Sequence, residues 1–359
     1  MFQKYTLTTR HTILRFLLMP AALLHAGVLW MRHMLYDVGV FSSQTGALPT
    51  IALGNLTVGG TGKTPHVLLL LEALEAIMGR GQVAILSRGY GRKTSGYREV
   101  YVGESAALTG DEPLMMKRKL PEVVVAVCED RLTGLKRIAA DHPEVRWVVL
   151  DDALQHRKLR PTLRLLLVDA TQPMGKDMLI PAGRLRDLKS RAEAAEATLV
   201  SRLPSNTVVP LTAEHRQSLG ISRVIPTFCS TMKMGRELRD LAPARTLVIC
   251  AIAQPQRFTD AVTRASSHSV AITYPDHQAF TPLHVQEWKR QMQKDNLDIL
   301  VTTEKDWVRM QDLEEHMSGL RVQPVSLEAK WLPNSDFHQW LQDAVEKKSQ
   351  VWSANQGGL

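Results

Sequence analysis

Short apolar runs alternate with amphipathic stretches along most of this chain. Ile51–Leu53, Gln82–Leu86 and Val123–Val127 are largely aliphatic, as in strands that a sheet buries on both faces. Two further runs of this kind are Trp147–Leu150 and Leu163–Val168. Between the runs, Pro65–Ile77 and Asp130–Ala140 carry apolar side chains at helical spacing. This alternation predicts an α/β fold built on a doubly wound parallel sheet.

The pattern loosens around Leu199–Pro210, where prolines and polar spacers replace the apolar runs. It then resumes, and the later predicted strands are Thr246–Ile249, Val270–Thr273, Asp298–Thr302 and Val322–Val325. We therefore expect four parts in the chain. They are an N-terminal helical segment at 1–40, a first α/β domain at 41–205, a smaller C-terminal α/β domain at 206–345, and a flexible tail at 346–359.

The N-terminal segment contains the apolar run Phe16–Trp30, which only His25 interrupts. The run is shorter than the roughly 20 residues that span a bilayer. Residues 1–36 carry no acidic side chain, and their basic residues are Lys4, Arg10, Arg15 and Arg32. A cleaved signal peptide and a buried core helix are alternatives. A membrane-associated helix in the cytoplasmic leaflet fits best, because basic flanks favour anionic headgroups on that side.

The amino-acid composition is that of a folded globular protein and does not by itself indicate a function. The 359 residues are 44% hydrophobic and 22% charged, as in ordinary globular proteins. A net charge of +8 suits an anionic partner such as nucleotide, anionic lipid or nucleic acid. No basic patch with interleaved aromatic residues supports nucleic acid, so we expect none as a partner. The three cysteines are widely spaced, which argues against a disulfide framework or a structural zinc site.

A glycine-rich loop follows the first predicted strand and precedes a predicted helix. It matches the phosphate-loop pattern G-x-x-x-x-G-K-[ST], except that Thr57 stands where the first glycine would be. Lys63 is expected to bridge the β- and γ-phosphates, and the Thr64 hydroxyl to hold Mg²⁺. A plain glycine-rich turn is the alternative, but the strand–loop–helix context is against it. The predicted nucleotide-binding residues are Thr57, Val58, Gly59, Gly60, Thr61, Gly62, Lys63 and Thr64.

A second metal-side element follows the apolar run Trp147–Leu150. Asp151 and Asp152 come directly after this strand, where a phosphate-loop fold presents a carboxylate to Mg²⁺. An ordinary helix cap or surface turn is the alternative reading of these two residues. The sequence does not indicate which of the two lies closer to the metal.

These motifs and several others resemble the tetraacyldisaccharide 4′-kinases of lipid A biosynthesis, over about residues 17–306. The motifs that carry the resemblance are Gly54–Pro65, Leu86–Arg92, Gly110–Pro113, Asp151–Arg157, Pro181–Asp187, Tyr274–His277 and Thr303–Asp306. The chain departs from the family pattern at Ala153, Leu154, Asp187 and Gln278, and at Ala251–Pro255.

The resemblance implies an ATP- and Mg²⁺-dependent kinase acting on the 4′-hydroxyl of a tetraacylated glucosamine disaccharide 1-phosphate. It also implies that Asp111 and His277 act as a pair, with Asp111 as the base. From local sequence alone, Asp111 would be an ordinary turn residue and His277 an ordinary surface or core histidine. Lys63 completes the expected catalytic set.

Further expectations concern the metal, the substrate and the location. Glu112 is expected to help Thr64, Asp151 and Asp152 hold Mg²⁺. The expected substrate-binding residues are Arg88, Arg186, Asp187 and Asp276. The expected partners are the lipid A disaccharide precursor and the inner-membrane surface. We expect a monomer, located on the cytoplasmic face of the inner membrane of a Gram-negative bacterium. The alternative function is a membrane-associated P-loop ATPase switch that phosphorylates no acceptor.

Overall fold

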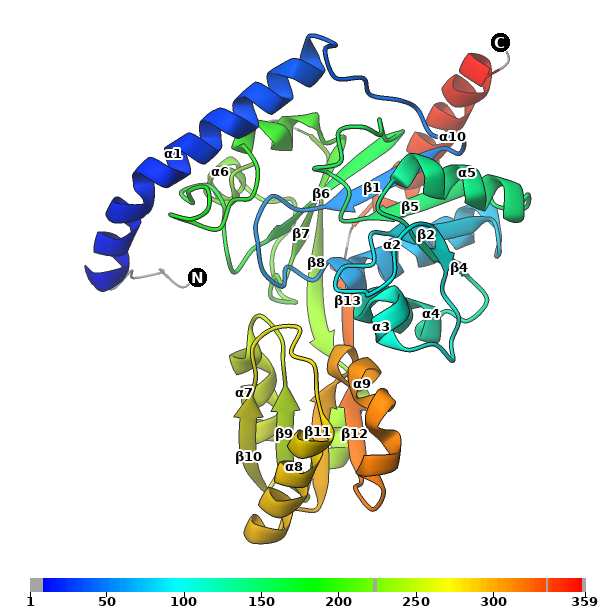
Figure 1. The fold of residues 1–359 in the computed structure, drawn as a ribbon. Coiled ribbons are helices and arrows are strands. Elements are labelled where there is room, and N and C mark those ends of the chain that lie inside the picture. Colours follow the sequence, from blue (N-terminus) through cyan, green and yellow to red (C-terminus); the bar gives the residue numbers. More distant parts are fainter. Residues whose placement is uncertain (1–8, 222–224, 334, 357–359) are drawn as a thin grey trace. The chain divides into compact units, whose positions relative to one another are not determined.

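The computed structural model describes residues 9–221, 225–333 and 335–356 of the chain (Figure 1). Its contacts divide the chain into two compact units, and each unit combines stretches that are far apart in sequence. Unit 1 comprises Met1–Arg88, Asp130–Met232 and Ala329–Leu359. Unit 2 comprises Gly89–Glu129 and Lys233–Glu328. The sequence pattern instead predicts consecutive domains, because it carries no information on which distant stretches pack together.

Unit 1 is built on a sheet whose strands run in the order β13-β8-β7-β6-β1-β5-β2. From β8 to β2 every neighbouring pair is parallel. This arrangement is the parallel sheet that the alternating pattern predicts. The strands are β1 (Thr50–Gly54), β2 (Val83–Ser87), β5 (Trp147–Asp151), β6 (Leu163–Asp169), β7 (Ala197–Ser201), β8 (Thr227–Met234) and β13 (Leu327–Trp331).

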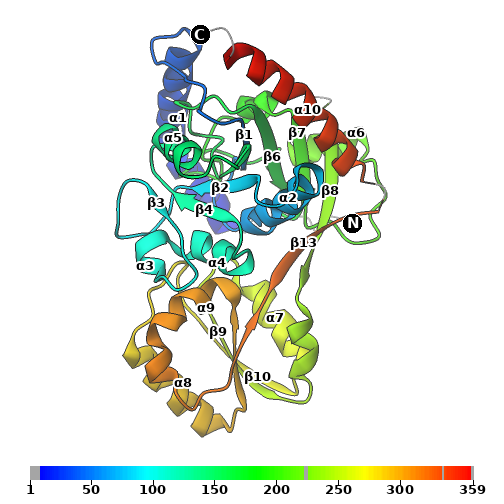
Figure 2. The same ribbon diagram turned by 90° about the vertical axis from the view of Figure 1, so that its right-hand side faces the viewer.

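Two helices of unit 1, α2 and α5, pack against this sheet. Helix α2 buries Val67, Leu70, Leu71 and Leu74 completely, and it contacts β1, β2 and β5. Helix α10 packs against α2, and α5 packs against β2. Figure 2 shows α2 and α10 from the side on which they lie. The helices are α1 (Thr9–Asp37), α2 (Lys63–Met78), α5 (Arg131–Asp141), α6 (Ala213–Leu219) and α10 (Phe337–Gln356), with the 3₁₀ helix η1 (Lys189–Ala194).

The last helix occupies most of the stretch that the sequence predicts as a flexible tail. Residues 346–356 continue α10, whose Leu341 and Val345 are buried. The indole Nε1 of Trp147 donates to Ser349 Oγ at 3.3 Å and fixes this part of the helix to the sheet. The prediction of a flexible tail, which rested on a composition rich in Gln, Ser and Asn, is therefore wrong for residues 346–356, which form a helix packed on unit 1. The remaining tail residues 357–359, like residues 1–8 of the N-terminal segment, lie outside the described residues.

Helix α1 is amphipathic, but its polar side faces protein and its apolar side is exposed, whereas an ordinary surface helix has the opposite arrangement. The side chains of α1 that face the rest of unit 1 include His25 and His33, and His33 is only 5% exposed. Its outward side is apolar, with Leu17, Leu24 and Trp30 more than half exposed. Residues 13–37 are long and apolar enough to cross a membrane by length and composition, and little of that stretch is buried. The polar side of α1 thus meets protein while its apolar side does not.

Unit 2 contains a four-stranded parallel sheet in the order β10-β9-β11-β12. Alternate residues of its strands supply two cores on opposite faces. Leu247 and Ile249 pack with Trp288 of α8, whereas Val248 and Cys250 pack with Phe258 of α7. The sheet elements are β9 (Arg245–Cys250), β10 (His268–Thr273), β11 (Ile299–Thr303) and β12 (Val322–Val325), with α7 (Pro255–Ala265), α8 (Pro282–Asp295), α9 (Glu304–Met310), η2 (Arg236–Leu241) and η3 (Gln311–Met317).

The other stretch of unit 2 brings helix α4 against α9. This contact explains why residues 89–129 belong with the C-terminal half of the chain. The elements of this stretch are the antiparallel strands β3 (Arg98–Glu99) and β4 (Val124–Val127) and the helices α3 (Ala106–Thr109) and α4 (Asp111–Lys119).

Candidate active site

The glycine-rich loop lies between β1 and α2, as its sequence predicts. Gly62 adopts φ 86° directly before α2, a left-handed conformation that favours glycine. No side chain caps α2, so the N–H groups of its first turn remain available to an anion. The buried Thr61 hydroxyl has no hydrogen-bond partner among the described residues. This is the geometry of an anion-binding loop at a helix N-terminus.

Asn55 explains why threonine can stand at the first position of the loop. Its buried side-chain amide donates to the Thr57 carbonyl at 2.7 Å and to Thr57 Oγ1 at 3.1 Å. Its Oδ1 accepts from Lys63 Nζ at 3.3 Å and from Arg186 at 2.7 Å. Asn55 therefore fixes the loop in place of a glycine turn. The sequence reasoning did not single it out, although its place directly after β1 was a usable signal.

The segment around Arg186 is held beside the loop by backbone pairing. Val58 N donates to the Arg184 carbonyl at 2.8 Å, and Arg186 N donates to the Leu56 carbonyl at 2.9 Å. The motif Pro181–Asp187 is thereby brought to the phosphate loop. Its distance of more than a hundred residues in sequence gave no hint of this pairing.

The carboxylate of Asp152 contacts two basic side chains of this site, those of Lys63 and Arg186. The strand register places Leu53 beside Asp151, so the end of β5 lies next to the start of the loop. Arg186 holds Asp152 through both guanidinium NH₂ groups, one of them at 2.8 Å. Lys63 Nζ lies 3.6 Å from Asp152 Oδ2. Burial opposes the charge on Asp152, but the Arg186 hydrogen bonds and the Lys63 charge outweigh it and hold its pKa below the ordinary value.

The residues at the end of β5 fit a magnesium ion by their chemistry. Asp151 and Asp152 offer carboxylates and Thr64 offers a hydroxyl, which are the hard oxygen ligands that Mg²⁺ prefers. Within the described residues no group of three or more His, Cys, Asp or Glu side chains could hold a metal. A small number of protein ligands is normal for Mg²⁺, which binds one or two carboxylates and completes its coordination shell with phosphate and water.

His66 is a second residue that the sequence reasoning missed. Its Nδ1 donates to the Gly62 carbonyl at 2.7 Å, because a carbonyl can only accept. Nε2 must then accept from Ser230 Oγ at 2.7 Å. Burial of the ring lowers its pKa to about 4, so it is neutral at pH 7. His66 thus ties the start of α2 to β8.

In unit 2 the structure brings Asp111 and His277 together, although 166 positions separate them. Asp111 is the first residue of α4 and is buried, and His277 lies in the loop after β10 with φ 59°. His277 Nδ1 lies 3.1 Å from Asp111 Oδ2. The edge of the Tyr90 ring contacts the imidazole at a centroid distance of 5.3 Å. The predicted pair is therefore a direct hydrogen-bonded pair.

Lys305 and Arg309 of α9 complete the surroundings of this pair. Lys305 Nζ lies 3.2 Å from His277 Nε2, and Arg309 Nε lies 3.9 Å from Asp111 Oδ2. Thr303 caps α9 by accepting from Asp306 N at 3.1 Å, which orients both basic side chains. The motif Thr303–Asp306 thus serves to place Lys305.

The pKa values of the pair move in opposite directions. Burial would raise the pKa of Asp111, but the His277 hydrogen bond and the Lys305 charge hold it below its ordinary value. The hydrogen bond to Asp111 raises the pKa of His277, against burial and the Lys305 charge. Asp111 is therefore ionised near neutral pH and able to accept a proton.

The remaining predicted residues lie in varied surroundings. Glu112 is in unit 2, with Oε1 3.1 Å from Lys305 Nζ, whereas the other predicted metal ligands belong to unit 1. Asp276 Oδ1 lies 3.7 Å from the same Lys305 Nζ, and Arg88 is exposed at the end of unit 1's first stretch. Asp187 is 1% exposed and binds His33 Nε2 at 2.6 Å. Its carboxylate faces α1 and not solvent.

A parallel sheet, an uncapped helix behind a glycine-rich loop, and a carboxylate held beside the loop lysine define a P-loop nucleotide-binding protein. The comparisons with known proteins identify which one. Residues 14–346 match the family model described as tetraacyldisaccharide-1-P 4′-kinase, and the chain belongs to this family. A kinase transfers a phosphoryl group, so this is a family of phosphotransferases.

Individual relatives agree over nearly the whole chain. The tetraacyldisaccharide 4′-kinase of Parabacteroides distasonis is 35% identical over 89% of this chain and 92% of its own length. That of Phocaeicola vulgatus is 30% identical over 92% and 95%. The solved structure of LpxK from Aquifex aeolicus in complex with ATP matches with a TM-score of 0.71 and 26% identity, covering 93% of this chain and 99% of that one.

Proposed function

We propose that this chain transfers the γ-phosphoryl group of ATP to the 4′-hydroxyl of a tetraacylated glucosamine disaccharide 1-phosphate. Family membership supports the reaction. The observation that favours transfer to a hydroxyl, over a nucleotide switch without an acceptor, is the buried carboxylate of Asp111 hydrogen-bonded to His277. A sugar hydroxyl is a poor nucleophile and benefits from such a base.

The unit 1 residues are assigned to the nucleotide. Lys63 and the open N–H groups of α2 would neutralise charge on the β- and γ-phosphates. Mg²⁺, when held by Asp152, Asp151 and Thr64, supplies further charge neutralisation. When phosphate draws Lys63 away from Asp152, the carboxylate retains Arg186 as its partner. Asp152 therefore stays ionised through the exchange of partners.

The unit 2 residues are assigned to the acceptor hydroxyl. Asp111 would take the hydroxyl proton, and His277 would hold the carboxylate through Nδ1. Lys305 fixes the imidazole from its other nitrogen. Arg88 and Asp276, which the sequence predicts to contact substrate, stay in this proposal as substrate-binding residues.

A kinase assay tests the proposal directly. Purified protein in detergent should transfer label from γ-³²P-ATP to the lipid disaccharide. Lys63→Ala and Asp111→Asn should each lower kcat by roughly 10²-fold or more, the size expected for a lost charge clamp or general base. Asp260→Asn, an exposed carboxylate on α7, serves as the matched control. Full transfer by the Asp111 variant would remove it as base, and hydrolysis of ATP with no labelled lipid would favour the switch.

We further propose that the protein sits on the cytoplasmic face of the inner membrane with α1 lying in the membrane plane. Polar contacts bind α1 to unit 1 from Arg15, 3.7 Å from Asp177, to His33, 2.6 Å from Asp187. At 1.5 Å per residue this fastened length is roughly 27 Å, nearly the thickness of the hydrocarbon core. A helix bound to a polar protein surface over that length cannot also be surrounded by lipid.

Spin labels can distinguish an in-plane helix from a spanning one. Leu17, Leu24 and Met31 are all exposed and seven positions apart, so they share one side of α1. The native cysteines Cys128, Cys229 and Cys250 are buried and should label poorly. An in-plane helix predicts equal depths for labels at the three α1 positions. Depths that step by roughly 10 Å would instead demonstrate a span. The monomeric state remains a prediction.

A further inference from the structure

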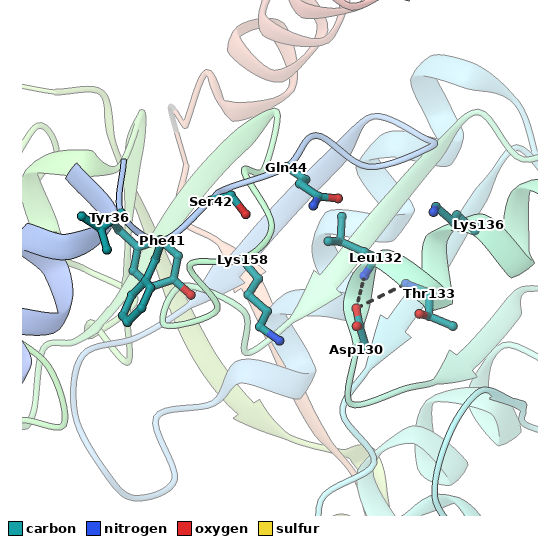
Figure 3. A pocket seen from close by; sticks show the side chains of 10 residues that line it. Tyr36, Phe41, Ser42, Gln44, Asp130, Leu132, Thr133, Lys136 and Lys158 are labelled. Atoms are coloured by element: carbon teal, nitrogen blue, oxygen red, sulfur yellow. Dashed lines mark hydrogen bonds between the residues drawn. The ribbon is translucent and has the colours of Figure 1, made fainter. Parts of the chain in front are cut away.

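A cavity of about 660 Å³ lies in unit 1 at the C-terminal end of α1. Figure 3 shows Tyr36 and Phe41 on one side, the start of α5 with Thr133 and Lys136 on the other, and Lys158 between them. Its volume falls within the roughly 300–1,000 Å³ of small-molecule sites. None of its lining residues belongs to the phosphate loop, to the end of β5, or to the Asp111–His277 pair.

The polar groups of the cavity suit a phosphate ester. Lys136 and Lys158 are exposed and form no ion pair with any described residue. Among the described residues, the only carboxylate that lines the cavity is Asp130, whose Oδ1 already accepts from Leu132 N at 2.9 Å and Thr133 N at 3.3 Å. The cavity therefore offers two free ammonium groups against one carboxylate that serves as a helix cap. Ser42 and Thr133 add hydroxyls to the lining.

Exposed apolar residues follow the last turn of α1, and two of them, Val40 and Phe41, line the cavity. Val38 and Val40 are each 66% exposed and Phe41 is 44% exposed, directly after the last turn of the helix. Exposed apolar side chains next to free lysines match the two halves of a membrane lipid, acyl chain and headgroup. The Tyr36 ring is held in place by the Arg157 guanidinium, 5.1 Å from its centroid.

We propose that this cavity seats the headgroup of an anionic phospholipid, with the phosphodiester between Lys136 and Lys158. The proposal rests on the in-plane position of α1 proposed above. A seated headgroup fixes the end of α1 at the level of the lipid phosphates and so sets the depth of the protein in the membrane.

Vesicle binding gives the first test. The full chain should sediment with phosphatidylcholine vesicles that contain phosphatidylglycerol more strongly than with phosphatidylcholine alone. Replacing both lysines, Lys136→Gln with Lys158→Gln, should weaken binding to the anionic vesicles by about thirty-fold, at roughly fivefold for each lysine. The control is Lys233→Gln with Lys294→Gln, which removes the same charge from exposed positions of unit 2. Equal loss in both double variants would overturn the proposal.

A soluble lipid separates a built site from general charge attraction. Monomeric dihexanoyl phosphatidylglycerol should bind the wild-type chain saturably, and dihexanoyl phosphatidylcholine should not. Thr133→Trp adds bulk at an exposed lining position and keeps the charge, and it should abolish this binding. Unchanged binding by that variant would contradict a seat in this cavity.

Kinase activity in detergent distinguishes the two sources of a phosphate group. The Lys136/Lys158 double variant should keep the wild-type KM for the disaccharide in neutral detergent micelles. A raised KM there would show that the cavity takes the substrate's own phosphate, which overturns the phospholipid assignment. Absence of kinase activity in the wild-type chain would refute the proposed function and leave the lipid-binding result standing.

Discussion

At the scale of single residues, one carboxylate organises the phosphate site. Asp152 is shared by Lys63 and by Arg186, and Asn55 joins both basic side chains through its Oδ1. The loop lysine is therefore held near its working position by groups that also hold each other. Such a linked set predicts that a small change in shape at one member affects nucleotide use.

Arg186→Lys tests this shape requirement, because lysine keeps the charge but cannot make the two-pronged contact with Asp152. We expect kcat/KM for ATP to fall by about 10- to 100-fold, the loss of one or two charge-assisted hydrogen bonds. Steady-state kinetics with varied ATP measures it. Arg184→Lys is the control, since Arg184 binds Asp177 and Gln172 and does not contact Asp152. Similar losses in both variants would contradict a specific role for the Asp152 contact.

His66 makes stability depend on pH. Its pKa is about 4 in the fold against an ordinary value of 6.5, so the unfolded chain takes up the proton first. Stability is then complete above about pH 6.5 and declines as pH falls toward 4. Between pH 7.5 and 5 this residue accounts for a loss of about 2 kcal/mol. Denaturant unfolding of His66→Gln should show a shallower decline than wild type, whereas the exposed His268→Gln should not. Parallel curves for all three proteins would refute the assignment.

The site residues that could be predicted from the sequence are those that belong to a short local motif or directly follow a predicted strand. Lys63, Thr64 and the aspartates after β5 follow from motif and strand position. The role of His66 was not recognisable, because it depends on Ser230, which is distant in sequence. Asn55 carried a local signal in its place directly after β1, but its contact with Arg186 appears only in the folded chain. Asp187 was expected at the substrate, but its partner on α1 appears only once the chain is folded.

At the scale of elements, the strands that apolar runs predicted agree with the structure to within two residues at each end. A short run of aliphatic residues indicates a central strand of a doubly wound sheet, because both faces of such a strand are buried. The weaker elements were not predictable: β7 overlaps the start of the stretch that looks like a domain boundary, and β8 mixes polar and apolar residues. The C-terminal part of α10 looked like a tail because its contacts, and not its composition, make it a helix.

Removing residues 347–359 tests that part of α10. The deletion takes away Ser349, which accepts from Trp147 Nε1, and Lys348, 3.9 Å from Glu196. We expect a loss of about 1–2 kcal/mol, or a few degrees in the thermal midpoint. A chain that ends at residue 356 is the control and should unfold like the full chain. A midpoint unchanged by the longer deletion would show that this stretch behaves as a tail after all.

The docking of α1 can be tested at His33. Arg157 donates to its Nδ1 at 3.2 Å, so Nε2 carries the proton that is donated to Asp187. His33→Leu leaves a buried carboxylate with one donor fewer and should cost about 1–3 kcal/mol. Limited proteolysis after α1 should accelerate in the same variant. His25→Leu, which loses a single partly exposed bond to the Ile180 carbonyl, should have a smaller effect. Equal effects of the two changes would argue against a special role for the buried bond.

At the scale of the whole molecule, nucleotide binding and the proposed base belong to different units. Unit 1 holds Lys63 and Asp152, and unit 2 holds Asp111 and His277. This separation makes the two assignments independently testable by stability. A ligand at 100 times its Kd stabilises the state it binds by about 2.7 kcal/mol.

ATP with Mg²⁺ should therefore raise the thermal midpoint of the wild-type chain and of Asp111→Asn alike. Lys63→Ala should lose most of the shift, because its contact lies at the phosphates. Omitting Mg²⁺ should reduce the shift in every variant that retains Asp152. Differential scanning fluorimetry with ATP alone, Mg²⁺ alone and both together measures these effects. Loss of the ATP shift in Asp111→Asn would assign this residue to nucleotide binding instead.

The interleaving of the two units also bears on synthesis of the chain. Unit 1 combines α1 with β13 and α10, which follow it by some three hundred residues, so its sheet lacks β13 until residue 331 has been translated. Helix α1 is translated more than a hundred residues before its polar partners Asp177 and Asp187, so its apolar side is made before the helix can dock. During that interval a bilayer surface is the natural cover for the helix. We therefore expect nascent chains to reach the membrane before they can bind nucleotide.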